Sequence, residues 1–156
     1  MGTSPTPAAA KQTTVPAKTS TTVRTRTSTT TAAATTTTST TAAPAGVTVL
    51  VLNGYTTYHA ALYFKNQLAA LGYDALAPNN AITDTNATST IFVVAPAYRP
   101  NALALARSPL GLPASAVVSP APTNDAAVPA ALLHQADLIL LVGGDLSRRV
   151  PAHYNG

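Results

Sequence analysis

The stretch from Val47 to Thr57, VTVLVLNGYTT, is the first part of the chain whose pattern predicts a folded element. A short run of apolar and β-branched residues ends at Asn53 and Gly54, which is typical of a buried strand bounded by a turn. One of the two threonines that follow can cap a helix. Apolar residues then recur at helical spacing until Gly72, which is expected to end this helix as a left-handed cap.

The order strand, glycine, helix also occurs in nucleotide-binding loops, but the residues after Gly54 argue against that class. A dinucleotide fingerprint needs G-x-G-x-x-G, and a P-loop needs G-x-x-x-x-G-K-[ST]. Here YTTY follows Gly54, and no second glycine occurs before Gly72. We expect Gly54 instead to let the chain turn sharply into the helix.

Further strands and one more helix are predicted downstream. The expected strands cover residues 73–77, 90–95, 114–118 and 138–142. Asn101 is expected to cap the second helix, with Leu103, Ala106 and Leu110 on one face. The order β-α-β-β-α-β-β predicts an α/β (α+β) fold: a small mixed sheet of about four to five strands with two helices packed mainly on one face.

Composition divides the chain into three parts. Residues 1–46 contain no carboxylate and long runs of threonine. Such a segment buries too little apolar area to offset its conformational entropy, so it is predicted to be a disordered Thr/Ala/Pro-rich linker, typical of a stalk. Residues 47–146 form the predicted domain, and residues 147–156 a flexible C-terminal tail.

The positive net charge does not mark a nucleic-acid surface. The formal charge of +4 comes wholly from the four basic residues of the linker, because residues 47–156 carry five basic residues and five acids. Specific nucleic-acid binding needs basic residues clustered on a folded face, so we expect none. The chain has no cysteine, which excludes disulfides and thiolate metal sites.

No local motif indicates catalysis. The histidines His59, His134 and His153 form no paired metal-binding motif, the chain has no glutamate, and G-x-S-x-G is missing. We therefore expect a protein that is not an enzyme and has no cofactor and no metal site. The alternative, an enzyme, would rest on His134 and Asp145 as the visible titratable pair.

Tyrosines offer a better candidate for binding. Most of them lie in or just after loops at the expected carboxyl ends of strands, where open α/β sheets often bind ligands. A tyrosine ring has a flat apolar face and a polar tip, which suits sugar rings and protein interfaces. The alternative is that these rings only cover the edges of the core. The candidate ligand- or partner-binding residues are Asn53, Gly54, Tyr55, Thr56, Tyr58, Tyr98 and Arg99.

Three stretches, taken in order, resemble the LytR C-terminal domain family: VTVLVLNGYTTYHAALYFKNQLAALGYDAL, STIFVVAPAYRPNALALARSPLG and ADLILLVGGD. The positions that carry this resemblance are Asn53, Gly54, Gly72, Tyr73, Tyr98, Gly143 and Asp145. Of these, Gly72, Gly143 and Asp145 are expected to be structural. The chain departs from the family at Thr56 and His59, where relatives usually carry further glycines.

The resemblance implies an extracytoplasmic, actinobacterial cell-envelope protein, anchored to the membrane by a segment that precedes Met1. It implies a non-catalytic module on a flexible stalk that scaffolds or regulates attachment of glycopolymers to peptidoglycan. Its expected partners are peptidoglycan or a wall glycopolymer, a LytR-CpsA-Psr family ligase, or both. Three alternatives stay open: a domain that binds peptidoglycan or glycan directly, an accessory domain of a ligase whose catalytic domain lies outside this chain, and an enzyme acting on wall polymer.

Overall fold

A computed structural model describes residues 46–155. The predicted linker, residues 1–46, lies outside the described residues except for Gly46. The elements are β1 (Thr48–Asn53), α1 (Ala60–Ala70), β2 (Asp74–Ala75), β3 (Asn79–Asn80), β4 (Thr90–Val93), η1 (Pro96–Tyr98), α2 (Arg99–Arg107), η2 (Ala114–Ala116), β5 (Val117–Val118), η3 (Ala130–Leu132), β6 (Leu138–Val142) and α3 (Gly144–Ser147), where η marks a short 3₁₀ helix.

The strands form one mixed six-stranded sheet in the order β2-β1-β6-β4-β5, with β3 also pairing with β1. The central strand β6 runs parallel to β1 and antiparallel to β4. The last strand along the path, β5, runs parallel to β4. The carboxyl ends of β1 and β6 therefore lie at one edge of the sheet, and the carboxyl end of β4 lies at the opposite edge. The mixed α/β fold expected from the sequence is confirmed.

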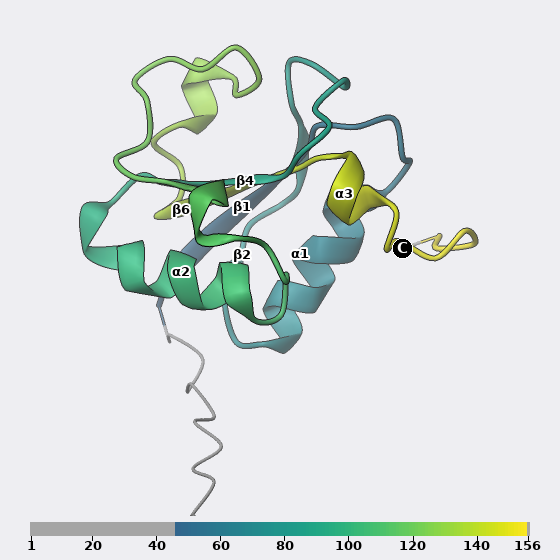
Figure 1. Ribbon diagram of the computed structural model, residues 1–156, viewed down its shortest axis with the longest axis horizontal. Helices are drawn as coiled ribbons and strands as arrows, with labels where there is room; N and C mark the ends of the chain where they lie inside the picture. The colour runs from purple at the N-terminus through teal and green to yellow at the C-terminus, as the bar shows by residue number, and fades with distance from the viewer. Residues whose placement is uncertain (1–45, 156) are drawn as a thin grey trace, which may run out of the picture. The chain divides into compact units, whose positions relative to one another are not determined.

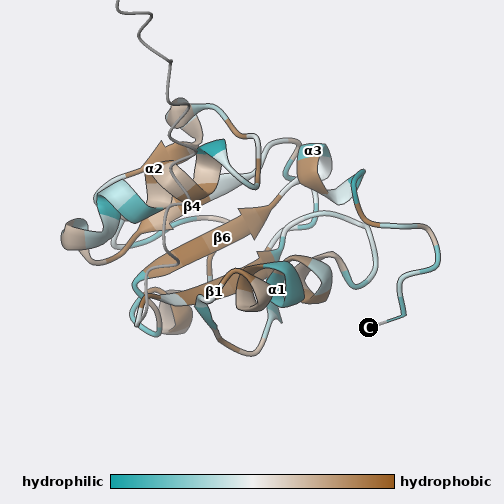
Figure 2. Cartoon of the chain, turned by 90° about the horizontal axis from the view of Figure 1, so that it is seen from below, coloured by the Kyte–Doolittle hydropathy of each residue, from teal (hydrophilic) through white to brown (hydrophobic). Residues whose placement is uncertain are grey.

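Both long helices, α1 and α2, pack on the same face of the sheet (Figure 1). Side chains alternate between the two faces along each strand, so every second strand residue points toward these helices. Val49, Val51 and Leu140 are fully buried there, against Leu68 of α1 and Leu105 of α2. Seen from the helix side, β6 is hydrophobic along its whole length (Figure 2). The predicted placement of both helices on one face is correct.

The opposite face is covered by the segment between β5 and β6, which contains η3 (Figure 1). Leu50, Leu52, Phe92, Ile139 and Leu141 of the sheet pack there against Ala127, Val128, Leu132 and Leu133. Val128 and Leu133 are only 1% and 2% exposed. The sequence predicts a loop over residues 120–129 but gives no sign that this proline-rich segment forms the third layer of the molecule.

The ends of α1 are set by backbone conformation. His59 is the residue that precedes the helix, and its φ of 59° is left-handed. The sequence suggested that a threonine caps this helix, and that prediction is wrong. At the other end, the N–H of Gly72 bonds to the Ala69 carbonyl and the N–H of Tyr73 to the Leu68 carbonyl. Gly72 has φ 88°, which confirms the predicted left-handed cap and completes a Schellman motif. Burial of the Tyr73 side chain raises the pKa of its hydroxyl above the ordinary value.

The start of α2 also differs from the prediction. This helix begins at Arg99 with a proline in its first turn, so Asn101 lies inside the helix and does not cap it. Its buried residues are Ala102, Leu105 and Ala106. Ala106 and Leu110 are buried as predicted, whereas Leu103 is only partly buried, and Ala102 and Leu105 take its place on the buried face.

Residues after β6 are more structured than the sequence indicated. The predicted tail boundary at residue 147 falls inside α3, where Leu146 and Ser147 are buried. Further on, the Tyr154 ring packs edge-on against Tyr63, with ring centroids 5.1 Å apart. The Tyr154 hydroxyl accepts a hydrogen bond of 2.7 Å from Nδ2 of Asn66 on α1.

A hydroxyl–carboxylate pair holds each end of the central strand β6. At its start, Oδ2 of Asp137 accepts bonds from the N–H and the hydroxyl of Thr48, at 2.9 and 2.8 Å. The Thr48 hydroxyl in turn accepts the Asp137 N–H at 2.9 Å. At its other end, Oδ1 of Asp145 accepts bonds from the N–H and the hydroxyl of Ser89, at 2.9 and 2.6 Å. The Ser89 hydroxyl accepts the Gly143 N–H at 2.8 Å. Each pair ties β6 to the strand beside it.

Candidate ligand-binding site

Gly54 lies beneath the candidate site and supports it by close packing. Its N–H donates to the Val142 carbonyl at 2.9 Å, and its own carbonyl accepts the N–H of Asn86 at 3.0 Å. A Cβ at this position would lie 2.7 Å from Cδ1 of Leu141. Its φ is not left-handed, so backbone conformation does not require a glycine at this position; the close approach of β6 and Asn86 does. Both polar backbone groups are occupied, so Gly54 is not itself a ligand-binding group.

Asn53 shapes the loop that follows β1. Its Nδ2 donates to the Thr57 carbonyl at 3.0 Å, and its Oδ1 accepts the N–H of Tyr55 at 3.4 Å. The Tyr55 ring turns toward the end of β6, where its Cε2 lies 3.0 Å from the place a Cβ of Gly144 would take. These two residues therefore act mainly on the loop and the core edge, while Thr56 is exposed at the loop tip.

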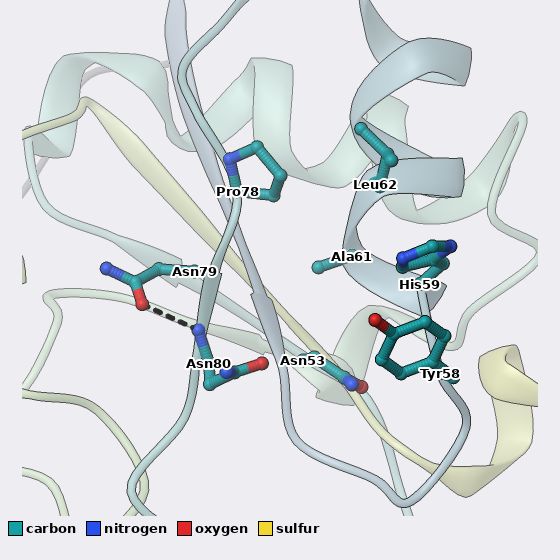
Figure 3. A pocket seen from close by; sticks show the side chains of 8 residues that line it. All are labelled: Asn53, Tyr58, His59, Ala61, Leu62, Pro78, Asn79 and Asn80. Atoms are coloured by element: carbon teal, nitrogen blue, oxygen red, sulfur yellow. Dashed lines mark hydrogen bonds between the residues drawn. The ribbon is translucent and has the colours of Figure 1, made fainter. Parts of the chain in front are cut away.

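Tyr58 and His59 form an aromatic pair at the entrance to α1. Their ring centroids are 4.0 Å apart with an interplanar angle of 29°. The Tyr58 side chain is 81% exposed. The left-handed conformation of His59 turns the chain so that both rings lie on the same side of the loop, facing β3 (Figure 3). The pair presents an exposed aromatic surface held by stacking.

Two adjoining hollows open beside this pair. The first has a volume of about 310 Å³ and is lined by Asn53, Tyr58, His59, Ala61, Leu62, Pro78, Asn79 and Asn80. The second has a volume of about 430 Å³ and is lined by Asn53, Tyr55, Thr56, Tyr58, Asn80, Ala81, Ile82 and Asp84. Asn53, Tyr58 and Asn80 border both. The exposed Tyr58 ring therefore stands between two concave surfaces at the carboxyl end of β1.

Neutral polar groups point into the first hollow. Figure 3 shows the Tyr58 hydroxyl and the Asn80 carboxamide directed toward one another across the space, one from the loop before α1 and one from β3. Within the described residues, neither group makes a hydrogen bond. The Asn79 side chain points away, and its Oδ1 accepts the N–H of Asn80 at 2.8 Å. Two groups that can each donate and accept are thus left for a ligand.

Tyr98 and Arg99 do not belong to this site. They follow β4, and β4 runs antiparallel to β6, so its last residue Val93 pairs with Leu138 at the start of β6. The same start of β6 pairs with Val49 near the start of β1. The two residues therefore lie at the sheet edge opposite Tyr58, so the candidate residues do not form a single site.

Asp145 has the structural role that the sequence suggested. Besides holding Ser89, its Oδ1 accepts the N–H of Leu146 at 2.8 Å. Gly143 is packed against the loop segment that leads into β4, because a Cβ there would lie 2.5 Å from the Thr88 carbonyl oxygen. His134 precedes the start of β6, whereas Asp145 follows its end. The pair on which an enzyme would rest is therefore separated by the length of the strand.

Among residues 46–155, no three side chains of the metal-ligating types come together. Within that range, every helix is too short or too polar to cross a bilayer.

Sequence reasoning missed one wall of the site. The sequence pattern places no strand at residues 78–80, whereas Asn79 and Asn80 form β3 and pair with Leu52 and Asn53. Asparagine is depleted in strands, so the local pattern carries no signal for this element. The sequence also gives no sign that His59 stacks on Tyr58, because this stacking depends on a left-handed backbone that a non-glycine residue seldom adopts.

Comparisons of this chain with protein-family models, with curated proteins and with solved structures found no match. The fold and the two hollows beside Tyr58 are therefore the features that bear on function.

Proposed function

We propose that this chain is a non-catalytic binding module of the cell envelope, and that the surface around Tyr58 holds wall carbohydrate. The observation that carries the proposal is the exposed Tyr58 ring, stacked on His59, with its hydroxyl facing the Asn80 carboxamide across a hollow of about 310 Å³. The resemblance to the LytR C-terminal domain family supplies the compartment and the wall polymer as context.

The chemistry of these groups matches a sugar ring. The apolar face of a pyranose or furanose can pack on an aromatic ring, while its hydroxyls need partners that both donate and accept. Tyr58 provides the flat face, and its hydroxyl and Asn80 provide such partners. The hollow has the size of a small-molecule site, at the lower end of the usual range.

The open shape of the surface favours weak and reversible contact. Two shallow hollows bury little of a long polymer at any one point, so a dissociation constant on the order of millimolar per sugar unit is expected. Weak contact suits a scaffold that keeps a glycopolymer and peptidoglycan close together while another protein joins them. The role in glycopolymer attachment is thus one of positioning.

The proposal is tested by NMR titration of the isotopically labelled full chain with a peptidoglycan-derived disaccharide. We expect amide shifts concentrated at residues 53–59 and 79–80. Tyr58→Ala is expected to weaken binding by about tenfold, since an aromatic contact of roughly 1 kcal/mol or more is lost. Tyr98→Ala, at the opposite edge of the sheet, is the matched control and should bind normally. Absence of localised shifts at the highest attainable sugar concentration would refute carbohydrate binding.

A second candidate function, docking of a ligase of the LytR-CpsA-Psr family, is favoured by Ile82. This side chain is 61% exposed and lines the second hollow beside Tyr58. Exposed aliphatic and aromatic groups side by side are typical of the centre of a protein interface. Ile82→Ser should weaken capture of the ligase by the immobilised chain while leaving the sugar-induced shifts unchanged, because serine removes apolar contact without touching Tyr58 or Asn80.

A further inference from the structure

We infer that the Tyr58 surface selects uncharged carbohydrate and discriminates against sugars that carry carboxylate or phosphate. The inference rests on the proposed carbohydrate binding and specifies the class of ligand. Its basis is the set of charges around the two hollows.

No lysine or arginine is among the described residues that line either hollow. Recognition of an anionic sugar normally depends on such cations, which form charge-assisted bonds to carboxylate or phosphate oxygens. Lys65 lies one turn beyond Ala61 on α1 and lines neither hollow. Arg149 is held elsewhere, where its guanidinium donates to the Leu110 carbonyl.

The charged side chain that does line this surface is an acid. Asp84 borders the second hollow together with Tyr58 and Asn80. A carboxylate about 6 Å from the negative charge of a ligand weakens binding of that ligand about threefold in water, and more where solvent is partly excluded. Asp84 therefore disfavours an anionic ligand that extends from the first hollow into the second.

Two backbone donors on the β3 side of the hollows are occupied as well. The N–H of Asn80 is taken by Oδ1 of Asn79, and the N–H of Ala81 by the Asn53 carbonyl at 2.9 Å. The amino end of α1 attracts anions through its dipole, which is equivalent to about half a positive charge. Asp84 lines the second hollow and carries a full negative charge, so an anionic group placed there meets repulsion that this half charge does not cancel.

The test compares two probes that differ in one charge: the disaccharide of N-acetylglucosamine and N-acetylmuramic acid with its lactyl carboxylate free, and the same disaccharide with that carboxylate amidated. In NMR titrations of the full chain at low salt, the amidated probe is expected to bind about threefold more tightly or better. High salt should reduce the difference by screening. Asp84→Asn should reduce it too, by improving binding of the free acid alone.

Lys65→Met is the control for a cation near the surface, and it should leave both affinities unchanged. Equal or tighter binding of the free acid by the unaltered chain would overturn the inference and leave carbohydrate binding intact. An unchanged preference in Asp84→Asn would also overturn it, because the selectivity would then have another cause. If neither probe shifts any signal at the Tyr58 surface, the proposed function itself fails.

Discussion

At the scale of single residues, two glycines set how closely the sheet and its loops approach. Gly54 leaves room for Leu141, and Gly143 leaves room for the backbone of Thr88 and Ser89. Gly143 has φ −95°, which any residue adopts, and the φ of Gly54 is not left-handed. Substitution at either site therefore measures steric crowding rather than backbone strain.

We predict that Gly54→Ala lowers the free energy of unfolding by about 1–3 kcal/mol, and that Gly143→Ala lowers it further. The order follows from the neighbours: the end of the Leu141 side chain can rotate away, whereas the backbone at Thr88 cannot. Urea unfolding measures both free-energy changes, provided that the dependence of the unfolding free energy on urea concentration is the same in each variant. Thr56→Ala, in the exposed tip of the same loop, should change stability by less than about 0.5 kcal/mol. Equal effects of all three substitutions would contradict the crowding argument.

At the scale of elements, the central strand β6 is held at both ends by hydrogen bonds to hydroxyl side chains at the starts of β1 and β4, the two strands beside it. Thr48 and Ser89 each stand at or just before a strand, and each bonds to an aspartate at one end of β6. Both hydroxyls donate to the carboxylate and accept a backbone N–H. These bonds fix where β1 and β4 begin relative to β6.

Ser89→Ala is predicted to cost about 1–3 kcal/mol of unfolding free energy, because it leaves the Gly143 N–H and the Asp145 carboxylate without that partner in a buried setting. Hydrogen exchange should show the loss most clearly at β4 and the end of β6. Ser115→Ala provides the control, since Ser115 lines the same hollow as Asp145 but is exposed. A Ser89 variant as stable as the Ser115 variant would argue that the bond contributes little.

At the scale of the whole molecule, the segment between β5 and β6 covers one face of the sheet, a position that helices occupy on the other face. It has little regular structure, yet it covers the face of the sheet opposite α1 and α2 (Figure 1). Leu133→Ala should therefore cost about 2–5 kcal/mol, as expected for a core leucine. Leu71→Ala is the control because Leu71 is 40% exposed. Thermal unfolding of the two variants decides whether this segment belongs to the cooperative core.

The sequence was most informative where one local rule dominates. The run of buried residues in β6 and the left-handed glycine after α1 are visible in the chain because each follows from apolar content or backbone geometry alone. The third layer, formed by the segment between β5 and β6, is not visible in the sequence, and neither are β3 and the Tyr58–His59 stack, because each depends on contacts that the local sequence pattern does not encode. Tyr98 lies far from Tyr58 because β4 runs antiparallel to β6. Short apolar runs do not encode the direction of a strand, so the sequence could not predict this separation.

The position of β6 also has a consequence for synthesis of the protein. The middle strand of the sheet is the last strand of the described chain, and β1 pairs with it from almost ninety residues away. While the nascent chain leaves the ribosome, β1 and β4 have no strand between them until residues 138–142 emerge. The domain should therefore stay open and exposed to proteases and chaperones until then, and it should close late and in one step.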